Sequence, residues 1–130
     1  MMSELNLNQV NPEENLTRYI FSTNNFSILN KRVKYPAFLP DSNGETSVFR
    51  TSNLSDTEIW KIGDSEVAQK RGVPLLGRAD ISTFQVLIQN LKVIPDNIPP
   101  RHATIIGWPE KSKQKLLAIE LAANAQLYLR

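Results

Sequence analysis

The sequence predicts an α+β domain in which a small, mainly antiparallel sheet is covered by two or three helices. Three observations lead to this expectation. Runs rich in β-branched and aromatic residues occur in the first half of the chain and again at residues 103–108. Helix start signals with a serine followed by Glu or Gln three positions later occur at residues 55–58 and 82–85. A mostly apolar stretch at residues 110–129 predicts a long C-terminal helix packed on the sheet.

The chain has 130 residues, which is enough for one hydrophobic core. Its 41% hydrophobic and 22% charged residues are ordinary for a globular protein, so a folded domain is expected. Residues 1–15 show no sustained hydrophobic period and predict a flexible N-terminal arm. Residues 16–130 then form a single domain.

The residue types exclude several kinds of site. Cysteine is absent and histidine occurs once, which removes disulfides, thiolate nucleophiles and zinc sites with sulfur ligands. We therefore expect no metal and no cofactor. No secretory signal or long apolar run is found, which favours a cytoplasmic location and no membrane partner. The net charge of +2 and a pI near 9.0 are weak signs of an anionic partner.

The first half of the chain predicts strands. Residues 17–22 carry β-branched and aromatic side chains, and residues 31–35 alternate charged with apolar ones. Pro36 limits the second strand to an edge or a bulge. Residues 40–44 (Pro-Asp-Ser-Asn-Gly) are typical of a tight turn, because Asn-Gly tolerates positive φ angles. We therefore predict a β-hairpin that pairs residues 31–35 with residues 46–51.

A helix is predicted directly after these strands. Ser55 and Glu58 have the spacing of a capping box, in which each side chain accepts a hydrogen bond from the other residue's backbone. Gly63 and Gly72 are both plausible helix ends. Residues 55–71 therefore form either two short helices or one kinked helix.

The second half of the chain contains four further predicted elements. Residues 82–91 place apolar side chains at helical spacing, and residues 91–94 predict a short strand. Three prolines make residues 95–100 an extended loop. Residues 103–108 are apolar without alternation, which predicts a strand buried on both faces, with its pairing direction open. A final helix covers residues 110–129.

The first candidate site is the pair Arg101 and His102, at the point where the proline-rich loop enters a strand. An unperturbed histidine titrates near pH 6.5, so His102 is a candidate general acid or base. Arg101 can bind a phosphate or carboxylate, and Thr104 lies on the same side of the strand as His102. The opposing interpretation, which we favour, is that His102 bonds a backbone carbonyl and Arg101 is solvated.

The second candidate site is residues 77–80, with the sequence Gly-Arg-Ala-Asp. A glycine turn followed by Arg78 and Asp80 before a helix start can bind an anion. In the alternative interpretation, Asp80 caps that helix and Arg78 pairs with Asp80 or points to water. Three aromatic residues are candidate interface anchors if exposed, and core or rim residues otherwise: Tyr35, Trp60 and Trp108.

Three runs, at residues 46–50, 77–80 and 99–109, are similar to those of a family of small, uncharacterised bacterial proteins. The similarity covers about residues 18–129. It implies a bacterial single-domain protein and assigns no catalytic role to any residue.

Three functional hypotheses result. The first is an interaction or accessory protein that acts through protein–protein contacts without catalysis. The alternative is a small hydrolase or transferase for a nucleotide or other phosphate-bearing ligand, with His102 as acid or base and Arg101 and Arg78 as anion clamps. This alternative requires the three residues to meet in one pocket. The third hypothesis, nucleic-acid binding, rests on scattered basic groups and is the least favoured.

Overall fold

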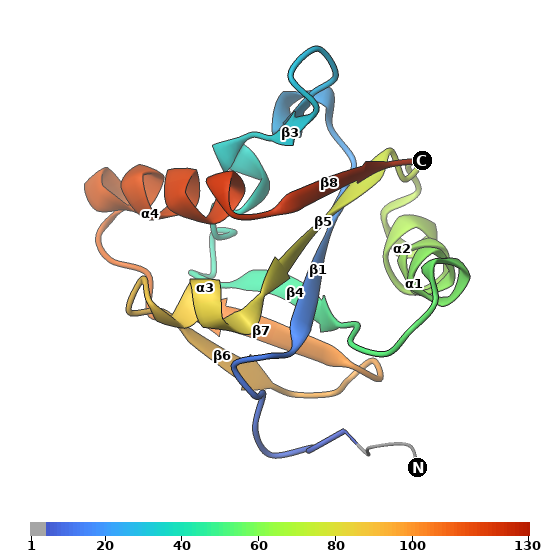
Figure 1. Cartoon of the computed structure of the whole chain (residues 1–130), viewed down its shortest axis with the longest axis horizontal. Helices are drawn as coiled ribbons and strands as arrows, with labels where there is room; N and C mark the ends of the chain where they lie inside the picture. The colour runs from blue at the N-terminus through green and yellow to red at the C-terminus, as the bar shows by residue number, and fades with distance from the viewer. Residues whose placement is uncertain (1–4) are drawn as a thin grey trace.

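A six-stranded antiparallel sheet forms the centre of the molecule, with helices on both of its faces (Figure 1). The computed structural model describes residues 5–130. The strands of this sheet are β1 (Asn15–Ile20), β4 (Thr46–Arg50), β5 (Gly77–Ser82), β6 (Lys92–Pro95), β7 (His102–Ile106) and β8 (Gln126–Leu129). They lie in the order β6-β7-β4-β1-β5-β8, and all neighbours are antiparallel. The predicted α+β class is confirmed.

The remaining elements are short, apart from the C-terminal helix. The helices are α1 (Asp56–Ile62), the π-helical η3 (Gly63–Ala68), α2 (Gln69–Arg71), α3 (Thr83–Leu87) and α4 (Lys111–Ala123). A small hairpin contains β2 (Phe26–Ser27) and β3 (Arg32–Val33), and the single 3-10 turns are η1 (Thr23–Asn25) and η2 (Tyr35–Ala37). Across residues 5–130, no helix combines the length and apolarity needed to cross a membrane.

The two faces of the sheet support two separate apolar clusters, because neighbouring residues of a strand point in opposite directions. Leu16 and Ile20 of β1 enter the main core, to which α4 contributes Ala118 and Leu121. Tyr19 points to the other face, where α1 lies. The smaller cluster on that face contains Tyr19, Phe49, Ile59 and Leu75.

One continuous helix, with the π-helical segment η3 in its middle, follows the predicted capping box. The Ser55 side chain accepts from the Glu58 amide at 3.2 Å, and the Glu58 carboxylate accepts from the Ser55 amide at 2.9 Å. Gly63 does not end the helix, since its φ of −59° is helical. It is needed for close packing: a Cβ there would lie 2.6 Å from the Tyr19 ring. Gly72, with φ of +69°, ends the helix as predicted.

The predicted hairpin between residues 31–35 and 46–51 is wrong. The turn itself forms, since the Gly44 amide donates to the Asp41 carbonyl at 2.8 Å and Gly44 has a φ of +81°. However, β3 pairs with β2, whereas β4 pairs with β1 and β7. The 3-10 turn η2 separates β3 from β4, so the local turn signal does not fix which strands are partners.

The predicted C-terminal helix is too long. It ends at Ala123, and the chain then forms the edge strand β8 against β5. Leu127 packs against the main core while the flanking Gln126 and Tyr128 point away from it, which is the period of a strand. Gly77 permits this pairing, because a Cβ there would lie 2.9 Å from the Tyr128 carbonyl oxygen.

Three other local predictions need correction. Residues 77–80 belong to strand β5 rather than to a turn, and Ser82, not Asp80, caps the following helix. That helix is shorter than predicted and leaves Phe84 exposed. The strand at residues 103–108 is not buried on both faces: β7 alternates, with Ala103 and Ile105 in the core. The predicted strand at residues 91–94 is confirmed as β6.

The N-terminal segment from residue 5 onward makes specific contacts with the sheet. Arg50 donates to the backbone carbonyls of Asn6 and Gln9, and Val10 is buried in the main core. Residues 1–4 of the predicted arm lie outside the described residues. The division into an arm and a domain stays a prediction, and these contacts show how residues 5–14 are held.

Candidate functional site

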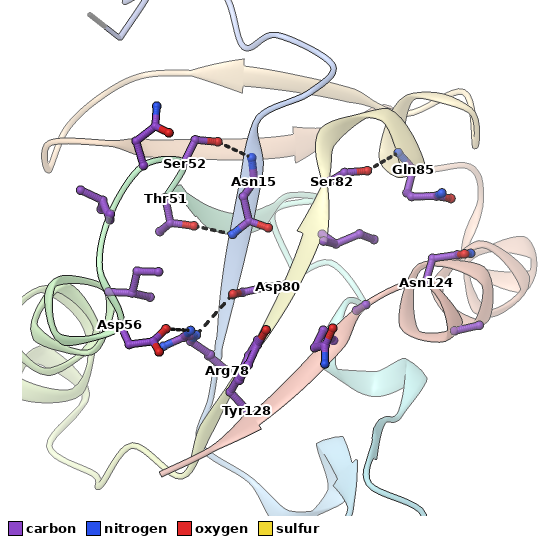
Figure 2. Close-up of a pocket in the computed structure, with 17 residues that line it drawn as sticks. Asn15, Thr51, Ser52, Asp56, Arg78, Asp80, Ser82, Gln85, Asn124 and Tyr128 are labelled. Atoms are coloured by element: carbon purple, nitrogen blue, oxygen red, sulfur yellow. Dashed lines mark hydrogen bonds and ion pairs between the residues drawn. The ribbon is translucent and has the colours of Figure 1, made fainter. Parts of the chain in front are cut away.

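A polar cleft of about 810 Å³ lies on the face of the sheet opposite the main core (Figure 2). It is bordered by β1, β5 and β8, by the loop that leads into α1, and by the C-terminal end of α4. Most of its side chains carry hydroxyl, amide or charged groups. Those labelled in Figure 2 are Asn15, Thr51, Ser52, Asp56, Arg78, Asp80, Ser82, Gln85, Asn124 and Tyr128.

The cleft is polar because two neighbouring strands alternate in the same way. In β5, Arg78 and Asp80 point into the cleft, whereas Ala79 enters the main core. In β8, Gln126 and Tyr128 line the cleft on the same face. The register places Arg78 beside Tyr128 and Asp80 beside Gln126. The strand period therefore assembles the site from residues that are far apart in the sequence.

Arg78 is the central residue of this cleft. It is only 2% exposed, and its guanidinium carbon lies over the rings of Trp60 and Tyr128, at 4.7 and 4.5 Å from their centroids. Its Nη2 donates to Asp56 at 2.7 Å. Its Nε lies 3.4 Å from an Asp80 oxygen without donating a hydrogen bond, and Nη1 has no partner among the described residues. Two donor nitrogens of a buried cation therefore make no hydrogen bond among the described residues, although Nε lies within ion-pair distance of Asp80.

The two acidic neighbours of Arg78 differ in exposure. The Asp56 side chain is 79% exposed, whereas that of Asp80 is 14% exposed. Figure 2 shows the Asp56 carboxylate on the guanidinium of Arg78, at the start of α1. An ion pair with one exposed partner is held weakly, because water competes for that partner. The ion pair between Asp56 and Arg78 therefore costs little free energy to break.

Asp80 is held from the neighbouring strand. The Thr17 hydroxyl donates to it at 2.7 Å and is in turn within 2.8 Å of the Thr51 hydroxyl, to which the Asn15 amide donates. Burial raises the pKa of the Asp80 carboxyl above its usual range, although Thr17 and Arg78 stabilise the charged form. This chain of hydrogen bonds fixes the floor of the cleft.

The structure places the predicted pair Arg101 and His102 outside the cleft. His102 Nδ1 lies 2.8 Å from an Asp96 oxygen, so its partner is a carboxylate rather than a backbone carbonyl. Arg101 donates to the Arg50 carbonyl at 3.0 Å, and Thr104 follows on β7. None of these residues lines the cleft that contains Arg78.

The sheet register gives the separation between the two candidate sites. His102 pairs with Phe49, Phe49 with Thr17, and Thr17 with Asp80. Three strand spacings put His102 about 14 Å from Asp80. The convergence of His102, Arg101 and Arg78 in one pocket, which the hydrolase hypothesis requires, is therefore not present.

The three aromatic candidates lie in different places. Trp60 contacts Arg78 and also lies under Arg130, at 5.2 Å. Tyr35 is half-buried beneath Lys115, at 4.9 Å. Trp108 is half-buried against the main core, and its indole N–H has no partner among residues 5–130. Only Trp60 supports the cleft.

Sequence reasoning named Arg78, Asp80 and Trp60 but missed most of the cleft. The missed residues are Asn15, Thr17, Thr51, Ser52, Asn53, Asp56, Ser82, Gln85, Asn124, Gln126 and Tyr128. The sequence does contain a pattern that indicates part of the cleft, because polar residues alternate with apolar ones through residues 77–82 and 126–129. Interpreted as two strands, those runs predict one polar face.

No protein-family model matches this chain, and the searches of curated proteins and of solved structures also found no match.

Proposed function

We propose that this protein is a non-catalytic binding protein whose polar cleft binds a small, uncharged, hydroxyl-rich ligand, a carbohydrate or a molecule resembling one. The observation that carries the proposal is the buried guanidinium of Arg78, whose Nε and Nη1 make no hydrogen bond among the described residues, beside a cleft of about 810 Å³. Buried donors without partners cost about 1–3 kcal/mol each, so an acceptor supplied by a ligand is strongly favoured there. The volume suits a small molecule.

The charges of the cleft argue against an anionic ligand. With Asp56 and Asp80 both ionised, the lining carries one positive and two negative charges. If Asp80 is protonated, the lining is neutral. At about 6 Å and an effective dielectric constant near 20, each unit pair contributes about 3 kcal/mol, so the second carboxylate opposes a phosphate by roughly that amount. An uncharged ligand avoids this cost.

The remaining side chains match the chemistry of hydroxyl groups. A hydroxyl both donates and accepts, so one group can accept from Arg78 while it donates to Asp80 or Asp56. The amides of Asn124 and Gln126 offer both functions at the rim. Several such contacts, each modest, provide selectivity because a ligand lacking a hydroxyl leaves a polar group unpaired.

Access to Arg78 requires a small rearrangement. The unpaired atoms Nε and Nη1 are themselves covered, whereas Asp56 is exposed and held by one ion pair. We infer that the Asp56 side chain rotates away to open the edge of the guanidinium. The contacts with Trp60 and Tyr128 hold the guanidinium in place, so the directions of its N–H groups do not change when Asp56 moves.

An NMR titration tests the proposal. The ¹⁵N-labelled full chain is titrated with glucose, mannose, N-acetylglucosamine and lactose, and separately with glucose 6-phosphate and uridine. We expect amide shifts at residues of β5 and β8 for at least one neutral saccharide, and weaker binding of glucose 6-phosphate. Arg78→Lys keeps the charge but loses the planar donor set, and should weaken binding about tenfold.

A matched control separates cleft binding from general effects. Arg71→Lys changes an arginine that also lies over an aromatic ring, Phe21, but lines no part of the cleft. It should leave the affinity unchanged. Preferred binding of glucose 6-phosphate or uridine, or an absence of saccharide shifts at β5 and β8, contradicts the proposal.

A further inference from the structure

A second concave surface lies between α4 and strand β3 with the two residues that follow it. It has a volume of about 270 Å³ and is lined by residues 32–35 on one side and by Ile119, Ala122 and Ala123 on the other. We call it the basic groove. The groove includes Tyr35, a candidate interface anchor in the sequence, which does not line the polar cleft.

The floor and one wall of the basic groove are apolar. Val33 is buried in the main core, and Tyr35 packs against it. Ile119 of α4, on the other side of the groove, is 41% exposed. Leu116 lies one turn earlier on α4 and is also exposed, which extends the apolar surface along the helix. Exposed aliphatic side chains beside a groove are typical of binding sites for apolar side chains of a partner.

The rim of the groove is positively charged. Arg32 and Lys34 line it, and the ammonium of Lys115 lies 4.9 Å from the centre of the Tyr35 ring. Within residues 5–130, none of these three cations forms an ion pair, and no acidic residue lines the groove. The groove therefore combines an apolar floor with three unpaired positive charges at its edge.

We propose that the basic groove binds an acidic peptide segment of a partner protein, with an apolar side chain seated between Val33, Tyr35 and Ile119. Acidic residues that flank this anchor would pair with Arg32, Lys34 and Lys115. Helical and extended peptides can both place charged residues beside an apolar anchor. The groove is therefore expected to select a peptide by its amino-acid composition and not by its backbone conformation.

The observations favour a peptide over a nucleic acid. Single-stranded nucleic acid binds through bases stacked on free aromatic faces along a continuous positive track. Here only Tyr35 is aromatic, and Lys115 covers a face of its ring. Three cations around an aliphatic floor suit a short acidic segment better than a phosphate backbone.

Phage display of random dodecapeptides on the intact protein provides the probe. We expect enriched peptides to contain Leu, Ile or Phe flanked by at least two acidic residues. The most enriched peptide, labelled with a fluorophore, is then measured by anisotropy against variants. Ile119→Glu places a charge in the apolar wall and should weaken binding at least about tenfold. Arg32→Glu with Lys34→Glu should weaken binding by a similar factor, which shrinks as salt is raised.

A matched double variant controls for net charge. Lys61→Glu with Lys92→Glu changes the total charge equally on exposed residues outside the groove, and should leave the affinity within about twofold. Circular dichroism checks that each variant is folded. Enrichment of peptides without acidic residues, or binding that Ile119→Glu and the Arg32, Lys34 reversal leave unchanged, overturns the proposal. Displacement of the peptide by an oligothymidylate, with tighter binding of that strand itself, points to nucleic acid instead.

Discussion

Among residues 5–130, the two buried arginines, Arg50 and Arg78, differ in how completely their donors are hydrogen-bonded. Arg50 is fully buried and donates from Nε and Nη2 to both oxygens of Glu14, and from Nη1 and Nη2 to two backbone carbonyls of the N-terminal segment. Arg78 is equally inaccessible but makes one hydrogen bond, to the exposed Asp56. A fully paired guanidinium stabilises a fold, whereas one with unpaired donors is available to bind a ligand.

The carboxylates beside these arginines differ in the same way. For Glu14, burial acts to raise the pKa, but the hydrogen bonds from Arg50 and the Asn11 amide outweigh it, so the pKa is lowered. For Asp80, burial prevails over Thr17 and Arg78, and the pKa is raised. The site around Arg50 therefore favours the charged form of its carboxylate, and the site around Arg78 does not.

The largest expected effect comes from breaking the paired site. Arg50→Met leaves Glu14 buried without its cation and frees the carbonyls of Asn6 and Gln9. We expect a loss of about 3–5 kcal/mol in the free energy of unfolding, measured by urea denaturation. Arg71→Met, at an exposed arginine, is the control and should cost less than about 1 kcal/mol. A loss below about 1 kcal/mol for Arg50→Met would remove the structural role assigned to this arginine.

The same type of change at the unpaired site should have a smaller effect on stability. The double variant Arg78→Met with Asp80→Asn removes both buried charges together. Since Nε and Nη1 of Arg78 make no hydrogen bond and Nη2 donates only to the exposed Asp56, we expect the free energy of unfolding to change by less than about 1.5 kcal/mol, while saccharide binding is lost. Urea denaturation and the NMR titration measure the two quantities. A loss as large as that for Arg50→Met would mean that Arg78 is a structural residue.

The pH dependence of stability distinguishes the two carboxylates. The lowered pKa of Glu14 contributes stability above its unfolded pKa of about 4.3, and that contribution is lost as pH falls through the folded pKa. The raised pKa of Asp80 has the opposite sign: its contribution is present below about pH 3.9 and is lost as pH rises through the folded pKa. Urea denaturation of Glu14→Gln and Asp80→Asn from pH 3 to 8 should flatten the corresponding part of each profile. An unchanged profile in either variant contradicts the assignment for that residue.

The smallest effect on stability is expected at Asp56, whose side chain is mostly exposed. Asp56→Asn should alter the free energy of unfolding by less than about 1 kcal/mol. It removes one negative charge from the cleft. Because water screens this exposed charge, its effect is smaller than that of a buried carboxylate, and discrimination against glucose 6-phosphate should fall by about tenfold relative to glucose. Ser52→Ala, at a neutral residue of the same cleft, is the control. Unchanged discrimination in Asp56→Asn would show that the cleft charges do not select the ligand.

The sequence correctly predicted those elements that depend on residues close to one another in the chain. The capping box at Ser55 and Glu58, the helix end at Gly72 and the strand predicted at residues 91–94 depend on neighbouring residues. All three form, the strand as β6 at Lys92–Pro95. The hairpin and the long C-terminal helix were wrong because strand pairing is decided by distant partners. The pairing of β8 with β5 depends on the space left by Gly77, about 50 residues earlier in the chain.

The candidate site was predicted only in part for the same reason. Arg78 and Asp80 were recognised as a pair, and their ion-pair distance of 3.4 Å agrees with the expectation that Arg78 pairs with Asp80. The glycine before them suggested a turn, so the strand period that brings Tyr128 and Gln126 beside them was missed. Asp56 was not predicted as a site residue, because its contact with Arg78 depends on how α1 lies on the sheet.

The guanidinium Nε–H signals of Arg50 and Arg78 test the central claim most directly, because both can be followed in one ¹H–¹⁵N spectrum during the saccharide titration. We expect the Arg78 Nε–H signal to shift and to become protected from exchange with at least one neutral saccharide, while the Arg50 signal stays unchanged. If a saccharide binds without moving the Arg78 signal, or if both arginines respond alike, the distinction between a paired structural arginine and an unpaired binding arginine is wrong.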